Sequence, residues 1–589
     1  MSRRVMRSTH PKVQATRRPR GAGEEESLPQ GRGCRPVMIR PARTACAVWG
    51  SLIAGAVCYW AAFPPLSLYG LAWLAPLPWL WWLSQPHLPR RFYWATYVAG
   101  LVFWLPTLQG IRLPHPLLYV GWIALSAYLS LYWVLFAWLS RRCLVSGRWP
   151  TWVALPLVWA VCEWLRGQGP LGFSAALLAH TQLSVLPLIQ VADLCGGYTL
   201  SALMLAVGTL LVNGLLYPAR RIVYSLSAIA LLVAASLYGW MRLASSPKGP
   251  VILRAALIQA DYDTVFEFNP ERNLQMFTDY LKLAQQAAHR EPDLDLIIWP
   301  ESTFTENNPY MVADEAVVPP PPDGLGAESW QKLWSERRRA FLDKCRYVAR
   351  STQQAADNHP GVWNLVGTEV IDFRQQPPAT YNSVLLLDRQ GNVRARYDKI
   401  HLVIFGEYLP FGRWFPWLYR ITPLSNGVTP GKEPVAMTVG EARLAPNICF
   451  ESTVPHLVGW HVHYLRRSGQ APDVLVNVTH DGWFWGSSIL DLHLACSVFR
   501  AVEQRRPLLM AANPGITAWV DGNGRVVAAL PRHAVRYLKA DVVRDGRFGL
   551  YSYVGDLPWW GAFLLVVVWG AGIRPGKEWL VWSKHQGGA

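Results

Sequence analysis

The sequence contains few charged residues, and acidic residues are especially scarce. Charged side chains make up 16% of its 589 residues, whereas soluble globular proteins carry about 25%. Acidic residues number 39 against 56 Lys and Arg. The chain is also 51% apolar and has 31 tryptophans, and aromatic rings favour the interface between lipid and water. This composition disfavours an ordinary soluble enzyme and predicts membrane spans joined to a soluble domain.

The nine cysteines never occur in C-x-x-C spacing, so the sequence predicts no metal site. Only Cys345, Cys449 and Cys496 fall in the large polar region. This odd number leaves at least one thiol free there, even in an oxidising compartment. No phosphate-cradling glycine motif is present either, and we expect no nucleotide or other cofactor.

The net charge of +17 is concentrated in a few places. Residues 1–45 hold eleven Lys and Arg against three Glu, and further Arg pairs occupy short loops at 90–91, 141–142 and 220–221. Basic loops between apolar spans follow the positive-inside rule, and this placement argues against nucleic-acid binding. Residues 1–43 are predicted to form a disordered basic extension. They do not resemble a cleavable signal peptide, because no apolar stretch follows closely.

Eight apolar segments have the length of a membrane span. They are expected at 44–64, 66–84, 92–110, 116–140, 150–166, 185–216, 221–243 and 557–574. The segment 185–216 is long for a simple crossing, and we expect a break near Gly196 and Gly197. The shorter apolar segment 167–184 is predicted to be re-entrant or interfacial.

The basic loops also predict an orientation. With the N-terminus in the cytoplasm, alternating spans place every basic loop inside. Seven spans over 44–245 then put 250–555 outside the cytoplasm, and a final span at 557–574 returns the tail 575–589 to the inside.

Residues 250–555 alternate strand and helix patterns, which predicts an α/β domain with buried sheets. Strands are expected at 251–260, 294–300, 362–371, 381–388, 441–450 and 473–480, and helices at 270–290, 328–356 and 489–505. The DGNG sequence at 521–524 predicts a hairpin turn. Residues 304–327, with four consecutive prolines, are interpreted as a loop insertion.

Three chemically distinct residues follow apolar, strand-like runs. Glu301 lies in WPES (299–302), Lys399 in YDKIHLVIFGEYLP, and Cys449 in NICFES. Singly, a Glu or Lys is more often a solvated surface charge, and a Cys in an apolar strand an inert core residue. Together they fit acyl transfer: a carboxylate takes the thiol proton, the thiolate attacks a carbonyl, and an ammonium holds the oxyanion.

The surroundings of Cys449 strengthen this interpretation. A polar stretch and a helix-like segment follow it, which places the thiol at a strand-to-helix turn. Helix N-terminal amides at such a turn lower the pKa of a thiol and can bind an oxyanion.

Taken in order, the three segments resemble the Glu-Lys-Cys triad of the nitrilase superfamily. Set between membrane spans, they closely resemble the apolipoprotein N-acyltransferase family. The resemblance covers about 44–574. It includes D-x-W-F at 481–484, R-A-V-E-Q-R-R-P at 500–507 and N-x-G-x-T at 513–517.

This resemblance implies an α/β fold, a nitrilase-like αββα sandwich fused to a bundle of about eight transmembrane helices. By position it implies that Glu301 is the general base, Lys399 the oxyanion-stabilising cation and Cys449 the nucleophile. Glu407 and Glu451 match supporting acids of the family, and the backbone N–H of Phe450 would complete the oxyanion site.

The resemblance also implies the substrates and the location. The acyl donor would be a membrane phospholipid, and the acceptor the α-amine of an S-diacylglyceryl cysteine that begins a lipoprotein. A cysteine thioester would link two half-reactions in ping-pong order, without metal or cofactor. The chain would lie in the bacterial inner membrane with its catalytic domain on the periplasmic side.

Several positions depart from the family pattern. Phe450 stands where an aromatic hydroxyl is common, Phe268 where a tryptophan is common, and His480 where asparagine is usual. The insertion at 304–327 is longer than the family norm. These departures leave the triad intact and bear on substrate preference.

The segment YLPFGRWFPWLYRI (408–421) is rich in aromatic residues. One interpretation is buried loop packing. Our hypothesis is a lid that dips into the outer leaflet, with Trp414 and Trp417 at the lipid headgroups.

Two other functions fit parts of the sequence. A membrane-anchored amidase of nitrilase type would use water in place of the amine, but a single anchor would suffice for it. A transporter is disfavoured because the apparent spans carry few acids, mainly Glu163 and Asp193, and because it would not explain the triad.

Overall fold

The computed structural model describes residues 44–145, 149–265, 269–313, 326–356, 361–375, 377–409 and 427–570, together with Gly412, Trp414, Phe415, Trp417 and Tyr419. The chain divides into Met1–Met38 and Ile39–Ala589, and the described residues all belong to the second unit. The predicted basic extension, the tail 575–589, Phe268 and the middle of the proline-rich insertion lie outside the described residues.

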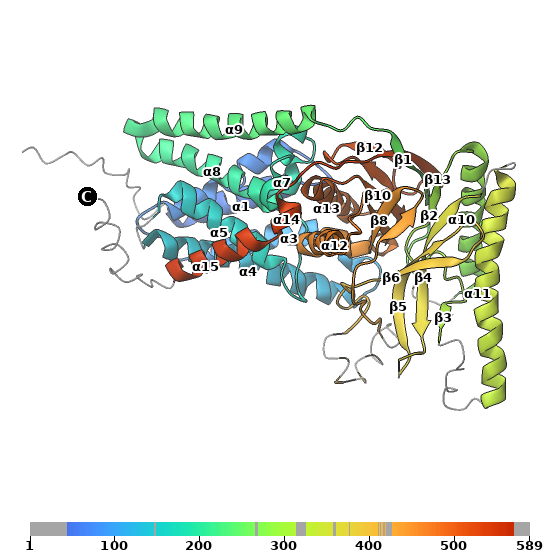
Figure 1. The fold of residues 1–589 in the computed structure, drawn as a ribbon. Coiled ribbons are helices and arrows are strands. Elements are labelled where there is room, and N and C mark those ends of the chain that lie inside the picture. Colours follow the sequence, from blue (N-terminus) through green and yellow to red (C-terminus); the bar gives the residue numbers. More distant parts are fainter. Residues whose placement is uncertain are drawn as a thin grey trace, which may run out of the picture. The chain divides into compact units, whose positions relative to one another are not determined.

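Apolar helices form the first half of the described chain, coloured blue to green in Figure 1, and the red helix α15 from near the C-terminal end packs with them. Helix α1 packs against α3, α3 against α4, α5 against α8 and α8 against α9, and α15 packs against α4 and α5. Their bounds are α1 Thr44–Ala62, α3 Phe92–Thr107, α4 Leu118–Val145, α5 Thr151–Arg166, α8 Gly197–Leu216, α9 Arg221–Ala244 and α15 Leu557–Gly570.

Among the described residues, four helical segments are long and apolar enough to cross a membrane. They are Ala45–Ala62, Leu118–Val145, Gly197–Leu216 and Pro218–Ala244. Helices α3 and α5 have 16 residues each and α15 has 14, which at 1.5 Å per residue gives lengths of about 21–24 Å.

The predicted span at 66–84 is not one helix. It consists of a short 3-10 helix, η2 (Tyr69–Trp73), and the seven-residue helix α2 (Leu77–Leu83). Pro76 and Pro78 lie at the start of α2, and proline lacks the N–H that a continuing helix would need.

The predicted break in 185–216 is confirmed. Short helices α6 (Leu186–Ile189) and α7 (Ala192–Cys195) precede α8, and the chain turns at Gly196, whose φ is +80°. Residues 167–184 contain only the 3-10 helix η4 (Leu178–Gln182), and residues 174–182 are all buried.

The second half of the chain contains two sheets. The first has the strand order β13-β1-β2-β4-β5-β6, with β3 on β4. Strand β2 runs parallel to β1 and β4, whereas β13, β5 and β6 pair antiparallel with their neighbours. The strands are β1 Val251–Gln259, β2 Leu296–Ile298, β3 Tyr310–Val312, β4 Trp363–Asp372, β5 Ala379–Leu387, β6 Val393–Asp398 and β13 Arg536–Val543.

The second sheet has the order β12-β11-β10-β9-β8-β7. Strands β8, β9 and β10 are parallel, and β11 and β12 form an antiparallel hairpin around the predicted DGNG turn. The strands are β7 Met437–Val439, β8 Ala442–Ile448, β9 Val474–His480, β10 Leu508–Asn513, β11 Ala518–Val520 and β12 Val526–Ala529.

Alternating side chains of the two sheets build separate cores, because successive residues of a strand point to opposite faces. In β1, Ala255 and Leu257 lie in the core between the sheets, whereas Ala256 and Ile258 face helices α10 (Pro270–Arg290) and α11 (Ala327–Ala355). The layers are thus helix, sheet, sheet and helix.

Helices α12 (Pro455–Arg467) and α13 (Ile489–Gln504) cover the outer face of the second sheet and lie beside the apolar helices in Figure 1. Val498 and Phe499 of α13 and Met510 of β10 belong to the same buried cluster as Phe103 and Leu200 of the helical region. The two halves therefore share one continuous core.

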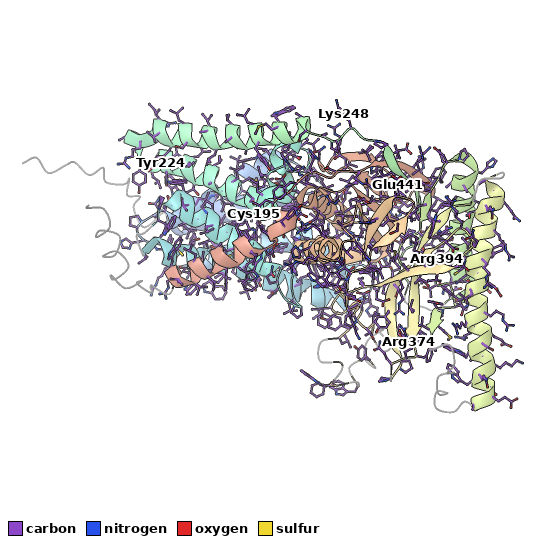
Figure 2. The ribbon with its side chains drawn as sticks, viewed as in Figure 1. Cys195, Tyr224, Lys248, Arg374, Arg394 and Glu441 are labelled. Atoms are coloured by element: carbon purple, nitrogen blue, oxygen red, sulfur yellow. The ribbon has the colours of Figure 1, made fainter. Side chains whose placement is uncertain are left out.

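Ion pairs are frequent in the α/β half. Arg374 pairs with Asp372 and Arg394 with Asp388, and Figure 2 places both arginines on this half, whereas Tyr224 and Cys195 lie among the apolar helices.

Candidate active site

The three predicted reactive residues follow strand ends, as expected. Glu301 is the third residue after β2, Lys399 directly follows β6, and Cys449 directly follows β8. Strands β2 and β6 belong to the first sheet and β8 to the second. The site therefore forms where the ends of the two sheets meet. Glu301 is 5% and Lys399 1% exposed.

Three hydrogen bonds fix the carboxylate of Glu301. Its Oε1 accepts from Asn382 Nδ2 at 2.7 Å and from Lys399 Nζ at 3.3 Å, and its Oε2 accepts the backbone N–H of His480 at 2.8 Å. Gly367 of β4 makes room for this turn, because a Cβ there would lie 2.6 Å from the Cα of Glu301.

Lys399 lies between two carboxylates. Its ammonium donates to Glu407 Oε1 at 2.9 Å and to Glu301 Oε1 at 3.3 Å. Burial disfavours the charged amine, but the charges of Glu301 and Glu407 outweigh it and raise the pKa of Lys399 well above its usual range. Lys399 is therefore an ammonium ion throughout the neutral pH range.

Glu407 and Asn382 close this ring of charges. The Nδ2 of Asn382 donates to Glu407 Oε1 at 3.0 Å as well as to Glu301, and Glu407 Oε2 accepts the N–H of Val403 at 2.9 Å. Glu407, predicted as a supporting acid, thus holds the lysine and its own loop together.

Cys449 begins the 3-10 helix η7 (Cys449–Thr453), and its φ is +52°. This left-handed conformation costs a non-glycine residue roughly 1–2 kcal/mol and is concentrated at functional turns. The carbonyl oxygen of Cys449 accepts from Asn477 Nδ2 at 3.1 Å and lies 3.1 Å from His493 Nε2.

The pKa of the Cys449 thiol depends on the other two predicted residues. Burial and the charge of Glu301 raise its pKa well above the usual range, with a further contribution from Asp481, whereas Lys399 and the hydroxyl of Thr479 lower it. The lowered pKa expected at this strand-to-helix turn is therefore wrong, because burial outweighs the turn; the resting group is a neutral thiol, and its reaction requires a base.

Glu451 connects the segments that carry Lys399 and Cys449. Its Oε1 accepts the N–H groups of Ile400 and His401, at 2.7 and 2.9 Å, and its Oε2 accepts the Ile448 N–H at 2.7 Å and the Tyr397 hydroxyl at 2.8 Å. The carboxylate is fully buried, and burial raises its pKa although these bonds oppose the shift.

Phe450 is half-buried between the catalytic domain and the helical region. Its ring stacks on His401 with centroids 5.8 Å apart, and it lies 6.5 Å from Phe173. Burial, together with the charges of His456 and Lys399, lowers the pKa of His401 to about 4. Phe450 therefore packs on a neutral imidazole.

The remaining predicted positions differ in their relation to this cluster. Trp414 is 72% and Trp417 57% exposed, so the buried-packing interpretation of their loop is wrong for these two side chains. His480 contributes its backbone N–H to Glu301, and burial lowers the pKa of its ring. Phe268 lies outside the described residues.

Sequence reasoning missed two residues of the site. Asn382 lies inside β5 and His493 inside α13, where polar residues amid apolar neighbours resemble ordinary interior positions. The D-x-W-F motif held a clue to the second, because Asp481 Oδ1 lies 3.1 Å from His493 Nδ1.

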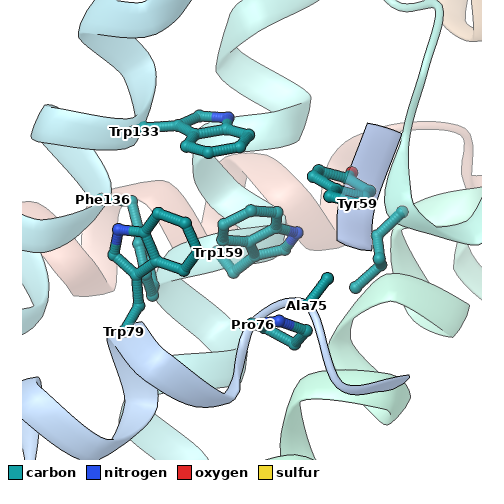
Figure 3. A pocket seen from close by; sticks show the side chains of 8 residues that line it. Tyr59, Ala75, Pro76, Trp79, Trp133, Phe136 and Trp159 are labelled. Carbon is teal, nitrogen blue, oxygen red and sulfur yellow. The ribbon is translucent and has the colours of Figure 1, made fainter. Parts of the chain in front are cut away.

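Within the described ranges, no group of three or more His, Cys, Asp or Glu side chains is arranged to hold a metal ion. A pocket in the helical region is lined by Tyr59, Ala75, Pro76, Trp79, Trp133, Phe136, Trp159 and Leu178 (Figure 3). Its walls are almost entirely apolar and include none of the triad residues.

Two family comparisons match the two halves of the chain. Residues 55–210 match the apolipoprotein N-acyltransferase N-terminal domain, and residues 254–546 match the carbon-nitrogen hydrolase family. Among solved structures, an amidase from Nesterenkonia sp. is 19% identical, covers 51% of this chain and 93% of its own, and has a TM-score of 0.34. The C. elegans NitFhit protein is 18% identical, covers 50% and 62%, and has a TM-score of 0.33.

Full-length relatives are more similar. The apolipoprotein N-acyltransferase of Rhodopirellula baltica is 32% identical over 540 residues, which cover 85% of this chain and 93% of the relative. That of Geobacter metallireducens is 30% identical over 518 residues, covering 85% and 90%. With this identity over nearly the whole length, and with both domain families matched in order, the chain belongs to the apolipoprotein N-acyltransferase family and is an acyltransferase with a nitrilase-like domain.

Proposed function

We propose that this enzyme moves a fatty acyl chain from a membrane phospholipid to the α-amino group of an S-diacylglyceryl cysteine that begins a lipoprotein. One observation carries the proposal: Glu301 and Lys399 of the first sheet form a buried ion pair, and the charges of both act on the thiol of Cys449 from the second sheet. A base, a cation and a nucleophile are what acyl transfer through a thioester requires.

In the first half-reaction, Glu301 takes the proton of Cys449. The sulfur attacks the ester carbonyl of the phospholipid, and Lys399 Nζ with the Phe450 N–H holds the resulting oxyanion. The intermediate collapses, its carbon–oxygen bond to the glycerol breaks, and Glu301 returns the proton to the departing lysophospholipid. The acyl chain remains on Cys449 as a thioester.

In the second half-reaction, the α-amine of the acceptor attacks the thioester. Glu301 takes a proton from the nitrogen, the same oxyanion site stabilises the intermediate, and the carbon–sulfur bond breaks as the sulfur regains its proton. The product is an amide, and the enzyme returns to its starting state. Sulfur suits this order because a thioester is readily attacked by an amine.

The electrostatics of the site fit these roles. Two carboxylates keep Lys399 protonated, so its charge is present before the oxyanion forms. A preorganised charge of this kind stabilises a transition state without reorganisation. Because the pKa of Cys449 is raised, the thiol depends on Glu301 as its base.

We also propose eight membrane crossings, with the catalytic domain on the periplasmic side of the inner membrane. Arg141 donates to the carbonyl of Gln85 at 2.8 Å, and Thr151 is hydrogen-bonded to Asn213. These contacts bring the three loops with Arg pairs toward one end of the bundle. Arg242, near the end of α9, contacts the carbonyl of Phe548 in the α/β half. Basic loops at the end away from the catalytic domain fit a cytoplasmic location.

The acyl-enzyme offers the direct test. Purified protein is incubated with phospholipid alone and its intact mass is measured beside Cys449→Ala and Cys449→Ser. We expect an adduct of acyl size on the wild type that hydroxylamine removes, no adduct on the alanine variant, and at most a hydroxylamine-resistant ester on the serine variant. Addition of a diacylglyceryl peptide should then clear the thioester and acylate the peptide amine.

A folded wild-type protein without an adduct would overturn the proposed donor. If small amides were hydrolysed instead, the nitrilase-type amidase activity would replace the transfer reaction. An adduct that persisted on Cys449→Ala would place the nucleophile elsewhere.

A further inference from the structure

The backbone of Cys449 adopts a conformation that needs support. Its left-handed φ of +52° is one that L-residues rarely adopt, and it depends on the surrounding contacts. The contacts converge on one atom, the carbonyl oxygen of Cys449. Asn477 Nδ2 donates to it at 3.1 Å, the hydroxyl of Ser452 at 3.4 Å, and His493 Nε2 lies 3.1 Å away.

The ring of His493 is held at its other nitrogen. Its Nδ1 lies 3.1 Å from Asp481 Oδ1, which also accepts the hydroxyl of Thr479 at 2.9 Å. His493 is 6% and Asp481 1% exposed, so water does not compete for these bonds. Asp481 therefore fixes the plane of the imidazole.

The partners of His493 determine which of its nitrogens carries a proton. A carbonyl oxygen can only accept a hydrogen bond, so the 3.1 Å contact with the Cys449 carbonyl requires a proton on Nε2. On the other side of the ring, Nδ1 lies 3.1 Å from the Asp481 carboxyl, and this contact holds the ring with Nε2 directed at the carbonyl.

The neighbouring hydroxyl groups also donate toward the Cys449 carbonyl. Ser497, one helical turn after His493 on α13, donates to Ser452 Oγ at 3.1 Å, and Ser452 in turn donates to the Cys449 carbonyl. Ser452 Oγ also lies 2.9 Å from His493 Nε2 and can share its proton. Each of these hydrogen bonds leads to the Cys449 carbonyl oxygen.

The Cys449 carbonyl belongs to the same peptide group as the N–H of Phe450. In a planar trans peptide, the C=O and the N–H point in opposite directions. A contact that fixes the orientation of this carbonyl on one side therefore aims the N–H on the other. The nitrogen involved is the backbone donor assigned above to the oxyanion.

We propose that His493, oriented by Asp481, is a positioning residue that aims the Phe450 N–H at the oxyanion by donating from Nε2 to the Cys449 carbonyl. The inference rests on the proposed function, because it needs Cys449 as the nucleophile. It gives a part in the chemistry to α13, the helix that joins the second sheet to the apolar helices.

The test separates oxyanion stabilisation from thiol reactivity. Single-turnover acylation by phospholipid is followed by intact mass, and alkylation of Cys449 by iodoacetamide is followed in parallel, since alkylation forms no oxyanion. We expect His493→Leu to slow acylation about 10- to 100-fold with KM for the lipid nearly unchanged, and alkylation to stay within about twofold of wild type.

Conservative variants separate positioning from packing. The amide nitrogen of His493→Gln reaches the place of Nε2 and should restore most of the acylation rate, whereas the shorter His493→Asn should not. Leu492→Ala, which removes a buried side chain next to His493, serves as the matched control: it should lower the unfolding temperature and leave acylation per folded molecule unchanged.

The outcomes are distinct. If Cys449→Ala still transfers acyl groups, the proposed function fails and this inference fails with it. If Cys449→Ala is inactive but His493→Leu acylates at the wild-type rate, only the positioning role fails. Equal loss of acylation and alkylation in His493→Leu, or a glutamine variant no better than leucine, would show that His493 supports packing alone.

Discussion

Arg505 and Asp193, 312 residues apart in the sequence, form a buried ion pair. Arg505 Nε donates to Asp193 Oδ2 at 2.9 Å and Nη2 contacts the same carboxylate oxygen, with 0% and 1% of the two residues exposed. Asp193 belongs to α7, and it also pairs with Arg242 and accepts the hydroxyl of Tyr238. The R-A-V-E-Q-R-R-P motif, which contains Arg505, thus joins the catalytic domain to the apolar helices.

Breaking this pair from one side should be costly. Arg505→Met leaves the carboxylate buried with one fewer cation, and we expect the free energy of unfolding to fall by about 3–5 kcal/mol. Asp193→Asn should cost at least as much, and the double variant should cost less than the sum. Denaturation in detergent measures all three. Arg544→Met, which breaks the more exposed pair Arg544–Asp473, is the control, and it should lower the free energy of unfolding by at most about 1 kcal/mol. Equal losses in Arg505→Met and Arg544→Met would contradict the role of burial.

Asn382 sets the balance of charge around Glu301. Asn382→Asp places a third carboxylate beside Glu301 and Glu407 with one ammonium to neutralise them. Like charges favour the protonated form of a carboxyl group, so Glu301 should stop acting as a base at a higher pH than in the wild type. The acidic limb of the pH–rate profile for acylation should therefore move up by about one pH unit or more. Acylation rates between about pH 5 and 9 test this. Asn382→Leu adds no charge and should shift the limb less, and an unmoved limb in the aspartate variant would refute the prediction.

His461 makes the fold sensitive to acid. Burial lowers its pKa from 6.5 to about 3. The unfolded chain therefore binds a proton below pH 6.5 that the folded protein does not accept until about pH 3. The free energy of unfolding falls as the pH drops through this window, by about 1.4 kcal/mol per unit.

His461→Phe removes this proton while keeping a ring against Tyr397. The variant should lose less stability than the wild type between pH 6.5 and pH 4. Denaturant unfolding at several pH values measures how steeply the free energy of unfolding changes with pH. Val462→Ala, a change at a buried neighbour, should lower the free energy of unfolding without altering this pH dependence. Identical slopes for wild type and His461→Phe would contradict the assignment.

Trp414 and Trp417 are available to lipid, with 72% and 57% of their surface exposed. Burying an aromatic side chain contributes about 1.5–3 kcal/mol, so changing both to Ser should raise the apparent KM for phospholipid in vesicles about tenfold or more. Turnover of a short-chain, water-soluble ester should stay the same. Tyr347→Ser on α11, another exposed aromatic change, is the control. A double variant that turns over vesicle lipid normally would rule out a lid.

The sequence predicted those parts of the site that depend on local pattern. Glu301 and Cys449 each follow a buried apolar strand, and Lys399 follows the partly exposed strand β6. Catalytic groups are often found at such strand ends, and here they come together where the ends of the two sheets meet. The break at Gly196 was equally visible, because a glycine pair inside an overlong apolar segment marks an end of a helix.

Such local patterns did not predict which segments far apart in the sequence lie side by side. Asn382 is beside Lys399 because β5 and β6 pair with Ser383 opposite Asp398, a register that no short segment specifies. His493 lies beside Asp481 because α13 packs against β10 and against the 3-10 helix Asp481–Phe484. The form of the segment 66–84 was missed for another reason, since its hydropathy predicted a span but did not show that Pro76 and Pro78 divide it into two short helices.

The shared core has a consequence for any attempt to separate the enzyme from its membrane. Met510 and Val498 of the catalytic half pack in the same cluster as Phe103 and Leu200 of the apolar helices. Cutting the chain at residue 250 would expose an apolar surface on the excised catalytic half. It would also remove the side chains that pack against the apolar helices. The protein should therefore melt in a single step, and no water-soluble version can be obtained by deletion alone.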